Sequence, residues 1–487
     1  MEPPAPDVLD PRPFRRRVQD LMSRPVRSCG PDIPVAEAAR QMAALGISSM
    51  VVVGPDGQPV GIVTERDLVV KVLAVGGSPA QPVSRVMTRP VITCRTTDFH
   101  ATALLTMLRH GVKHLPVLDE AGRLVGMVTL GDLSRQRDLG AAALADAIER
   151  ARDVQALVRA RERADDILRT LVRDRAAPDE VLAVATEFND RLTRRVVALA
   201  EGALGPPPAA YAFLVMGSAG RGEQYVRSDQ DNALVWADPP PGREEEAERY
   251  FALLGERAVT LLEKCGFAPC PGGVMASRPD WRRPMSAWLE EVARWATAPT
   301  GERIRAATIF FDFRAVAGDR RLGQELRRRA VALARASGLL LHHLAADDLQ
   351  HRVPIGPFGI LLLRGPRRGL LDLKTDAGVH LVDGLRVLAL RRGSLATGTL
   401  QRLRDLLAEQ EIDPVLGESL ESAFETLMRL RIRRALLPET CPSPPPLSGH
   451  TRLRPEELSP REARELREAL AAISKLQDHL GLVFHAG

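Results

Sequence analysis

The N-terminal third of the chain contains an internal repeat, which limits the possible folds more strongly than composition does. The segment DLMSRPV at 20–26 returns as RVMTRPV at 85–91, and GIVTERDL at 61–68 returns as GMVTLGDL at 126–133. Both pairs are offset by 65 residues. Two matches in the same register predict two copies of one small structural unit.

Each copy has the same order of predicted elements. An amphipathic helix (35–45 and 101–110) precedes a β-rich run, a turn and a second strand. This β-α-β-β-α order resembles the cystathionine-β-synthase (CBS) domain, and two copies in tandem resemble the pseudo-twofold pair that such domains form. The resemblance covers residues 18–138, with copies at 18–78 and 83–138. It implies that the chain can form a homodimer through its CBS pair.

A short segment in each copy is a candidate for nucleotide binding. In CBS domains the G-h-h-T-x-x-D segment commonly binds an adenosine nucleotide, and the matching residues here are Thr64 with Asp67 and Thr129 with Asp132. A carboxylate can accept both ribose hydroxyls, and a Thr hydroxyl can donate to a phosphate. The resemblance therefore implies AMP, ADP or ATP as a regulatory ligand. The alternative is structural, because Thr often ends a strand and Asp often caps the next helix.

The composition is that of a soluble globular protein. The 487 residues are enough for two to four domains, and no apolar run approaches the ~20 residues that span a bilayer. The Pro-rich residues 1–17 predict a disordered leader rather than a signal peptide. A net charge of +5, spread along the chain, gives no support to a nucleic-acid partner. Five scattered cysteines without a CxxC pair argue against a zinc site or a disulfide framework and indicate the cytoplasm.

Two helical regions frame the middle of the chain. Residues 140–205 predict two helices, divided at RAAPDE, with Pro178 suited to a first helical turn. These helices act as a lever between the repeat and the next domain, or they simply pack on that domain. From Gln324 onward the pattern is mostly helical, which predicts a helical domain at 331–487.

The segment GSAGRGEQYVRSDQDNALV carries the residues most indicative of chemistry. Gly217 and Ser218 follow a predicted buried strand, and Asp229 and Asp231 lie at the next one. Residues two apart on a strand point to the same face, so the two carboxylates can converge. A glycine lets the backbone approach a phosphate closely, and the serine can donate its hydroxyl.

A third carboxylate is predicted nearby. The run RIRAATIFFDFRAVAGD predicts another apolar strand with Asp312 in its middle. Carboxylates and water suit Mg²⁺, and two such ions ~3.5–4 Å apart can activate an attacking oxygen and stabilise a leaving one. The alternative is that Arg314, two residues on and on the same face, pairs with Asp312 for purely structural reasons.

The whole constellation resembles the polymerase-β-like nucleotidyltransferase superfamily. Its mark is Gly-Ser, then Asp-x-Asp about ten residues later, then a carboxylate on a third strand. The closer resemblance is to nucleotidyltransferases fused to CBS pairs and related to the uridylyltransferase that modifies the PII protein. Segments at 271–296, 309–319 and 354–390 match the same family. The resemblance implies a transferase domain at 206–330 and a substrate-binding domain at 331–487.

The resemblance also implies a role for each site residue. Gly217 and Ser218 would hold the nucleotide phosphates, Asp229 and Asp231 the metal ions, and Asp312 would complete the metal site and orient the acceptor. Arg221 and Lys374 would contact phosphate. Two alternatives stay open: Arg221 pairs with Glu223 to support the loop, and Lys374 is an ordinary surface lysine.

The predicted fold class is thus a multidomain α/β protein with a CBS pair, a polymerase-β-like α+β core and a C-terminal helical bundle. The predicted function is CBS-regulated transfer of NMP from an NTP to a hydroxyl on a protein or small molecule, with two Mg²⁺ ions. The rival prediction is a non-catalytic sensor of adenine nucleotides that retains only the fold of the transferase.

Overall fold

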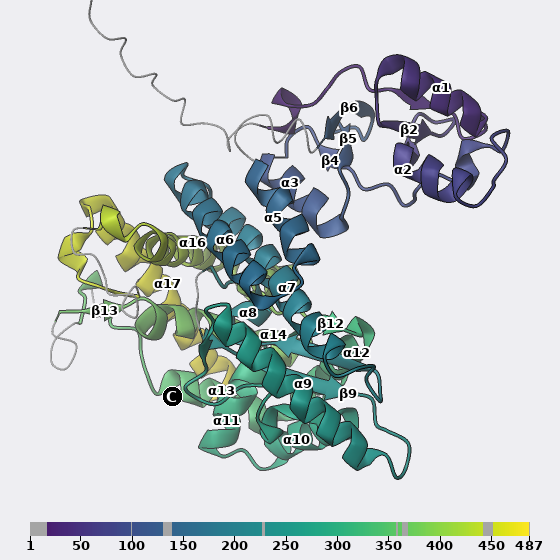
Figure 1. The fold of residues 1–487 in the computed structure, drawn as a ribbon. Helices are drawn as coiled ribbons and strands as arrows, with labels where there is room; N and C mark the ends of the chain where they lie inside the picture. The colour runs from purple at the N-terminus through teal and green to yellow at the C-terminus, as the bar shows by residue number, and fades with distance from the viewer. Residues whose placement is uncertain are drawn as a thin grey trace, which may run out of the picture. The chain divides into compact units, whose positions relative to one another are not determined.

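The computed structural model divides the chain into two compact units, Met1–Ala145 and Asp146–Gly487 (Figure 1). The predicted class, a multidomain α/β protein with a helical C-terminal region, is confirmed. The described residues are 17–98, 100–129, 139–225, 229–356, 359–362, 369–441 and 451–486.

The first unit contains the predicted repeat. In each copy a short strand pairs in parallel with a second strand, which pairs antiparallel with a third. The first copy comprises β1 (Ser28–Cys29), α1 (Val35–Leu45), β2 (Ser49–Val53), β3 (Pro59–Thr64), α2 (Glu65–Leu68) and the π-helical turn η2 (Val69–Leu73). The second comprises β4 (Cys94–Arg95), α3 (His100–His110), β5 (His114–Leu118) and β6 (Leu124–Thr129).

The repeated segments pack crosswise between the two copies. Met87, near the start of the second copy, lies against Gly61 on β3 of the first, where a Cβ would overlap the methionine side chain. Met22, at the matching position of the first copy, lies against Gly126 on β6 in the same way. Main-chain bridges from Ile62 to Thr88 and from Ser23 to Met127 fix the same contacts. A larger residue at either glycine would therefore force the other copy's methionine side chain to move.

Helices open the second unit. Its predicted first helix is divided, because Asp153 accepts a hydrogen bond from the Ala156 backbone N–H (2.8 Å) and starts a new helix. Pro178 lies in the first turn of the next helix, as predicted. Helix α5 (Leu139–Arg150) spans the boundary between the two units, and α6 (Val154–Arg173) and α7 (Pro178–Gly202) follow within the second. Helices α6 and α7 pack on each other and on the rest of the unit, α7 against the long helix α9 (Glu244–Lys264).

A four-stranded sheet forms the core of the second unit, with order β11-β9-β7-β12. Strand β7 runs antiparallel to both of its neighbours, and β11 runs parallel to β9. A separate pair joins β8 and β10. The strands are β7 (Tyr211–Val215), β8 (Asp229–Gln230), β9 (Asn232–Trp236), β10 (Ala268–Pro269), β11 (Arg282–Pro284) and β12 (Arg314–Gly318).

The predicted strand around Asp312 is wrong in its first half. The apolar residues before Asp312 belong to helix α11 (Gly301–Phe310), which follows α10 (Met285–Thr297). Thr300 caps α11 by accepting from the Arg303 N–H, and Ile304, Ala307 and Phe310 form its buried face. Asp312 lies in the turn that follows, before β12 begins.

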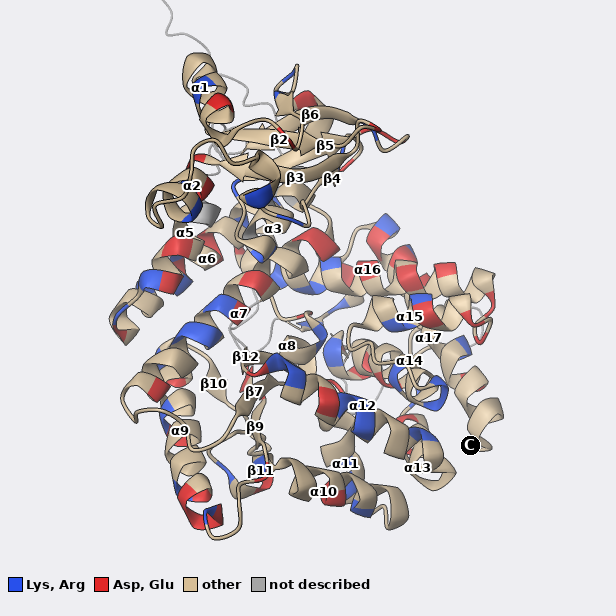
Figure 2. Cartoon of the chain, turned by 90° about the vertical axis from the view of Figure 1, so that its right-hand side faces the viewer, with Lys and Arg blue, Asp and Glu red and all other residues tan. Residues whose placement is uncertain are grey.

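The rest of the second unit is helical, as predicted. Helix α17 begins with the capping box of Ser459 and Glu462 that its sequence indicates. Helix α16 carries acidic residues in its first half and basic residues in its second half, and both kinds also occur along α9 (Figure 2). The elements are α12 (Arg320–Ala336), α13 (Gly338–Leu349), β13 (Leu371–Asp372), the π-helical turn η7 (Lys374–Gly378), α14 (Val379–Arg392), α15 (Thr399–Ala408), α16 (Pro414–Leu436), β14 (Arg452–Leu453) and α17 (Pro460–Phe484). Across the described ranges, no helix has the length and apolar character needed to cross a membrane.

Candidate active site

The Gly-Ser turn lies directly against the second carboxylate of the Asp-x-Asp pair. Strand β7 ends at Val215, and the chain turns through Gly217 (φ 54°) into the short helix α8 (Gly217–Arg221). A Cβ at Gly217 would lie 2.6 Å from Oδ2 of Asp231. Only glycine therefore fits, because the backbone has a positive φ and a carboxylate occupies the space of a side chain.

The two aspartates of the pair lie together, as predicted. Asp229 is exposed on β8, and Asp231 is half-buried just before β9. Burial raises the pKa of Asp231, and the nearby charge of Asp229 raises it further. The Cys270 thiol and the Lys374 ammonium oppose this rise by interacting with the same carboxylate. The net result is a raised pKa for Asp231, with burial as its largest cause.

Two residues distant in the sequence, Lys374 and Cys270, interact with Asp231. Lys374 is exposed at the start of η7, and its charge stabilises the Asp231 carboxylate. The thiol of Cys270 forms a hydrogen bond with Asp231, and burial together with that bond raises the thiol pKa to about 11. Lys374 was a predicted site residue. Cys270 was not, because a single cysteine in a loop carries no motif.

Asp312 lies in a different environment from the one predicted. Its side chain is fully buried, and three guanidinium groups surround it. Arg386 donates from Nε to Oδ1 (2.8 Å) and from Nη2 to Oδ2 (2.6 Å). Arg221 contacts Oδ2 through Nη1 (2.6 Å), and Arg402 contacts Oδ1 through Nη2 (2.8 Å). We call Asp312, Arg221, Arg386 and Arg402 the arginine cluster.

The charges of this cluster determine the state of Asp312. Burial alone would raise the pKa of its carboxyl group, but Arg386, Arg402 and Arg221 outweigh burial and hold that pKa well below its usual range. Both carboxylate oxygens are occupied by guanidinium donors. The arrangement therefore gives no support to Asp312 as a metal ligand. The alternative pairing with Arg314 is not formed, since Arg314 pairs with Asp190 of α7 (2.9 Å).

Arg221 and Glu223 form the pair that the sequence left open. The Nε of Arg221 donates to Glu223 Oε2 at 2.6 Å, while Glu223 Oε1 accepts from the Thr399 backbone N–H of α15 at 2.9 Å. The loop after β7 is thus fastened to two C-terminal helices, to α14 through Asp312 and Arg386 and to α15 through Glu223. Arg221 is engaged in this support and is not exposed for binding phosphate.

The residues at the Asp-x-Asp pair fit a divalent cation bound with a phosphate. Within the described part of the chain, no group of three His, Cys, Asp or Glu side chains is arranged to hold a metal ion. Mg²⁺ commonly takes only one or two protein carboxylates and completes its shell with water and substrate phosphates. Asp229 and Asp231 supply carboxylates of this kind beside the close backbone approach at Gly217.

The candidate adenosine site of the first unit is internally satisfied. Asp67 Oδ2 accepts from both the backbone N–H (2.9 Å) and the hydroxyl (2.7 Å) of Thr64, so the two residues cap α2. Asp67 Oδ1 contacts Lys71 Nζ (2.7 Å) and the Thr88 hydroxyl (3.0 Å). In the second copy Thr129 ends β6 as predicted, and Asp132 lies outside the described residues.

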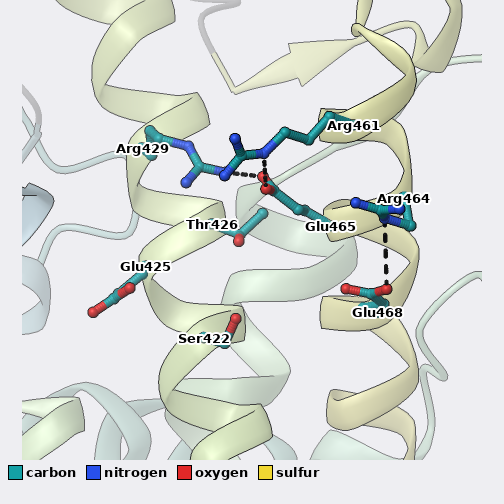
Figure 3. Close-up of a pocket in the computed structure, with 8 residues that line it drawn as sticks. All are labelled: Ser422, Glu425, Thr426, Arg429, Arg461, Arg464, Glu465 and Glu468. Atoms are coloured by element: carbon teal, nitrogen blue, oxygen red, sulfur yellow. Dashed lines mark hydrogen bonds and ion pairs between the residues drawn. The ribbon is translucent and has the colours of Figure 1, made fainter. Parts of the chain in front are cut away.

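A groove lies between α16 and α17 in the C-terminal region (Figure 3). Its volume is about 500 Å³, and charged side chains line most of it. Arg429 and Arg461 both contact Glu465, and Arg464 faces Glu468. Each basic side chain of the groove therefore already has an acidic partner.

Comparison with known families identifies three kinds of domain in the chain. CBS domain models match residues 18–74 and 83–137, and the model described as "Putative nucleotidyltransferase DUF294" matches residues 162–302. The model "Putative nucleotidyltransferase substrate binding domain" matches residues 338–484. The chain belongs to the family of proteins that join a CBS pair to the DUF294 nucleotidyltransferase domain and its substrate-binding domain.

Two curated relatives each match about a quarter of the chain. An uncharacterised protein of Methanopyrus kandleri is 37% identical over 117 residues, which is 24% of this chain and 60% of that protein. The inosine-5′-monophosphate dehydrogenase of Methanocaldococcus jannaschii is 31% identical over 25% of this chain and 24% of the enzyme.

Solved structures match a similar share. A CBS-domain-containing protein from Agrobacterium tumefaciens is 37% identical and covers 25% of this chain and 98% of its own, with a TM-score of 0.24. A CBS domain protein from Pyrobaculum aerophilum, solved in complex with AMP, is 28% identical and covers 25% of this chain and 92% of its own, also with a TM-score of 0.24.

Proposed function

We propose that the protein transfers a nucleoside monophosphate from an NTP to a hydroxyl group of an acceptor. The acceptor oxygen attacks the α-phosphorus and forms a new P–O bond. The bond from the α-phosphorus to the bridging oxygen of the β-phosphate breaks, so pyrophosphate leaves, and the hydroxyl proton passes to water. The observation that carries this proposal is the position of Gly217 against Asp231, with Asp229 beside it.

Asp229 and Asp231 would hold Mg²⁺, which supplies positive charge against the triphosphate and the leaving pyrophosphate. Ser218 would donate its hydroxyl to a phosphate oxygen, and Lys374 would neutralise phosphate charge. We assign Asp312 to positioning of the loop, because it holds Arg221. A second Mg²⁺ would have to take its ligands mainly from substrate and water. The resemblance of the site segment to the uridylyltransferase of the PII protein makes a hydroxyl on a protein our preferred acceptor.

The first prediction is that Mg²⁺-dependent NTP binding requires the aspartate pair. Changing Asp229 and Asp231 together to Asn should weaken Mg·NTP binding by more than about 100-fold, because loss of outer-shell partners alone costs ~10–100-fold in metal affinity. Titration calorimetry of the full chain with each of the four NTPs, with and without Mg²⁺, measures this directly.

Asp238→Asn is the matched control. Asp238 lies two residues after β9, the strand that follows the aspartate pair. It accepts a hydrogen bond from the Ser286 hydroxyl (2.6 Å) and lies outside the site, so Mg·NTP binding should not change. Equal NTP affinity with and without Mg²⁺ would contradict the proposed site. Binding of Mg·NTP without label transfer to any acceptor in a cell lysate would instead favour the non-catalytic sensor.

We further propose that the CBS pair binds an adenine nucleotide and regulates transfer. Asp67 is the residue to test, because a ribose could replace Thr88 and Lys71 as the partner of its Oδ1 oxygen. Asp67→Asn should weaken AMP binding to the full chain about 10-fold or more, the scale of one hydrogen bond to a charged group.

Asp56→Asn is the control for this test, since Asp56 is exposed and only accepts from the Gln58 N–H in the same copy. Its AMP affinity should equal that of the wild type. If millimolar AMP, ADP and ATP give the wild-type chain neither binding heat nor a shift in melting temperature, Thr64 and Asp67 serve only to cap α2.

A further inference from the structure

One arginine of the substrate-binding domain has no acidic partner among the described residues. Arg431 lies on α16, and it makes a weak polar contact with the Met428 sulfur (3.8 Å). Its Nε is buried without a hydrogen-bond partner in the same part of the chain. A guanidinium group has five donors and keeps its charge, so an unsatisfied one is a strong site for an anion.

The neighbouring arginines of α16 each have an acidic partner, although the Nε atoms of Arg433 and Arg434 are, like that of Arg431, buried without a hydrogen-bond partner in the described structure. Arg429 pairs with Glu465, Arg433 with Glu462 (2.5 Å) and Arg434 with Glu457 (3.0 Å). Figure 3 shows Arg429 directed at Glu465 on α17. The lack of an acidic partner is therefore specific to Arg431 and is not a general property of this helix.

Arg431 lies against the loop that follows α8. Its guanidinium carbon is 5.7 Å from the centre of the Tyr225 ring, and Tyr225 follows Glu223 by two residues. Tyr225 is only 3% exposed, and its hydroxyl has no well-aligned hydrogen-bond partner in the described structure. Burial raises the pKa of this hydroxyl, while the charge of Arg431 and a side-chain interaction with Arg431 lower it, so the hydroxyl is neutral at physiological pH and can donate. Two kinds of buried donor thus lie side by side.

The same arginine lies against the turn that carries Lys374. A Cβ at Gly378, the last residue of η7, would be 3.5 Å from Nη1 of Arg431. Lys374 is the first residue of that turn. Lys374 in turn acts on the carboxylate of Asp231. Arg431 and Lys374 therefore flank one helical turn next to the proposed metal site.

We infer that Arg431, with the Tyr225 hydroxyl, binds the terminal phosphates of the nucleoside triphosphate. This inference rests on the proposed function. It states which part of the substrate contacts η7 and α16. The α-phosphate lies at the aspartate pair, where transfer occurs, and the β- and γ-phosphates extend toward Lys374 and Arg431. The substrate-binding domain thereby contacts the nucleotide as well as the acceptor.

The test compares ligands that share or lack these phosphates. Arg431→Gln should weaken binding of Mg·NTP to the full chain about 10- to 100-fold, the scale of lost hydrogen bonds to a charged group. Binding of the corresponding NMP should change less than about 3-fold, because NMP has no β- or γ-phosphate. Tyr225→Phe should give a smaller loss of the same kind. Arg429→Gln, on the same helix but paired with Glu465, should leave both affinities unchanged.

Three outcomes separate this inference from the proposed function. Equal losses for Mg·NTP and NMP, or no loss for either, would overturn the role of Arg431. If the wild type binds tripolyphosphate but not Mg·NTP, and Arg431→Gln abolishes the former, the phosphate subsite stands and the proposed function fails. If the wild type binds neither ligand, both fail. Melting temperatures of all variants show whether each one is folded.

Discussion

Replacement of Asp312 by Asn is expected to lower the free energy of unfolding of the second unit by roughly 3–5 kcal/mol. Asp312 is the acidic group shared by Arg221, Arg386 and Arg402 in the arginine cluster. Asp312, Arg386 and Arg402 are buried, and Arg221 is largely buried. An amide cannot balance three guanidinium charges, so the variant leaves cations in a region without water. All four tryptophans (236, 281, 288 and 295) lie in this unit, so their fluorescence during urea unfolding measures its stability alone.

The control for this variant is Asp280→Asn. Asp280 forms an exposed pair with Arg283 (3.3 Å), and such pairs contribute little, so its stability should stay within about 1 kcal/mol of the wild type. A stable Asp312→Asn variant that has lost Mg·NTP binding would return Asp312 to the metal site. A destabilised variant that retains Mg·NTP affinity per folded molecule supports the positioning role.

Acidification provides an independent check on the same residue. The pKa of Asp312 is lower in the folded state than in the unfolded chain, so its ionised form stabilises the fold. That contribution is fully present above the unfolded pKa of about 4 and is lost as the pH falls through the folded pKa. The difference in stability between wild type and Asp312→Asn should therefore shrink below about pH 4.

Gly220→Ala is expected to destabilise the second unit by at least about 3 kcal/mol, at the upper end of overpacking effects. A Cβ at this position would overlap the carbonyl oxygen of Asp312 and lie 2.8 Å from that of Val215. Both obstacles are main chain, so no side chain can rotate away. The substitution would also separate α8 from the turn that carries Asp312. Urea unfolding followed by tryptophan fluorescence gives the magnitude.

Gly301→Ala serves as the control for a glycine-to-alanine change. Gly301 opens α11, and nothing lies within 4 Å of a Cβ there, so the variant should be neutral or slightly more stable. If Gly220→Ala proved as stable as Gly301→Ala, the close packing of α8 on the Asp312 turn would be wrong.

The repeat and the Asp-x-Asp pair could be predicted from sequence because both are set by residues close together along the chain. The helix at 35–45 is correct to the residue, since Val35, Ala38 and Met42 mark one buried face and Gly46 ends it in a left-handed conformation. Asp229 and Asp231 lie near each other because two residues of extended chain hold them on one side.

The surroundings of Asp312 could not be predicted in the same way. An apolar run such as IFF suits a buried strand and a buried helix equally well, and Thr300 as a helix cap was the signal for the helix. The partners Arg386 and Arg402 lie 74 and 90 positions further along the chain, in a region rich in arginine. Which arginine meets which carboxylate depends on helix packing, and no local pattern contains that information.

The crosswise fit of the two methionines has a consequence for how such a repeat can change over evolutionary time. Met22 and Met87 each fill a space at a glycine of the other copy, Gly126 and Gly61. A lone copy would present an unfilled glycine and an exposed methionine, so neither half is a complete folding module. Gain or loss of the CBS pair by gene rearrangement is therefore expected to involve both copies together, and a change at one methionine is expected to favour a compensating change at the glycine that faces it.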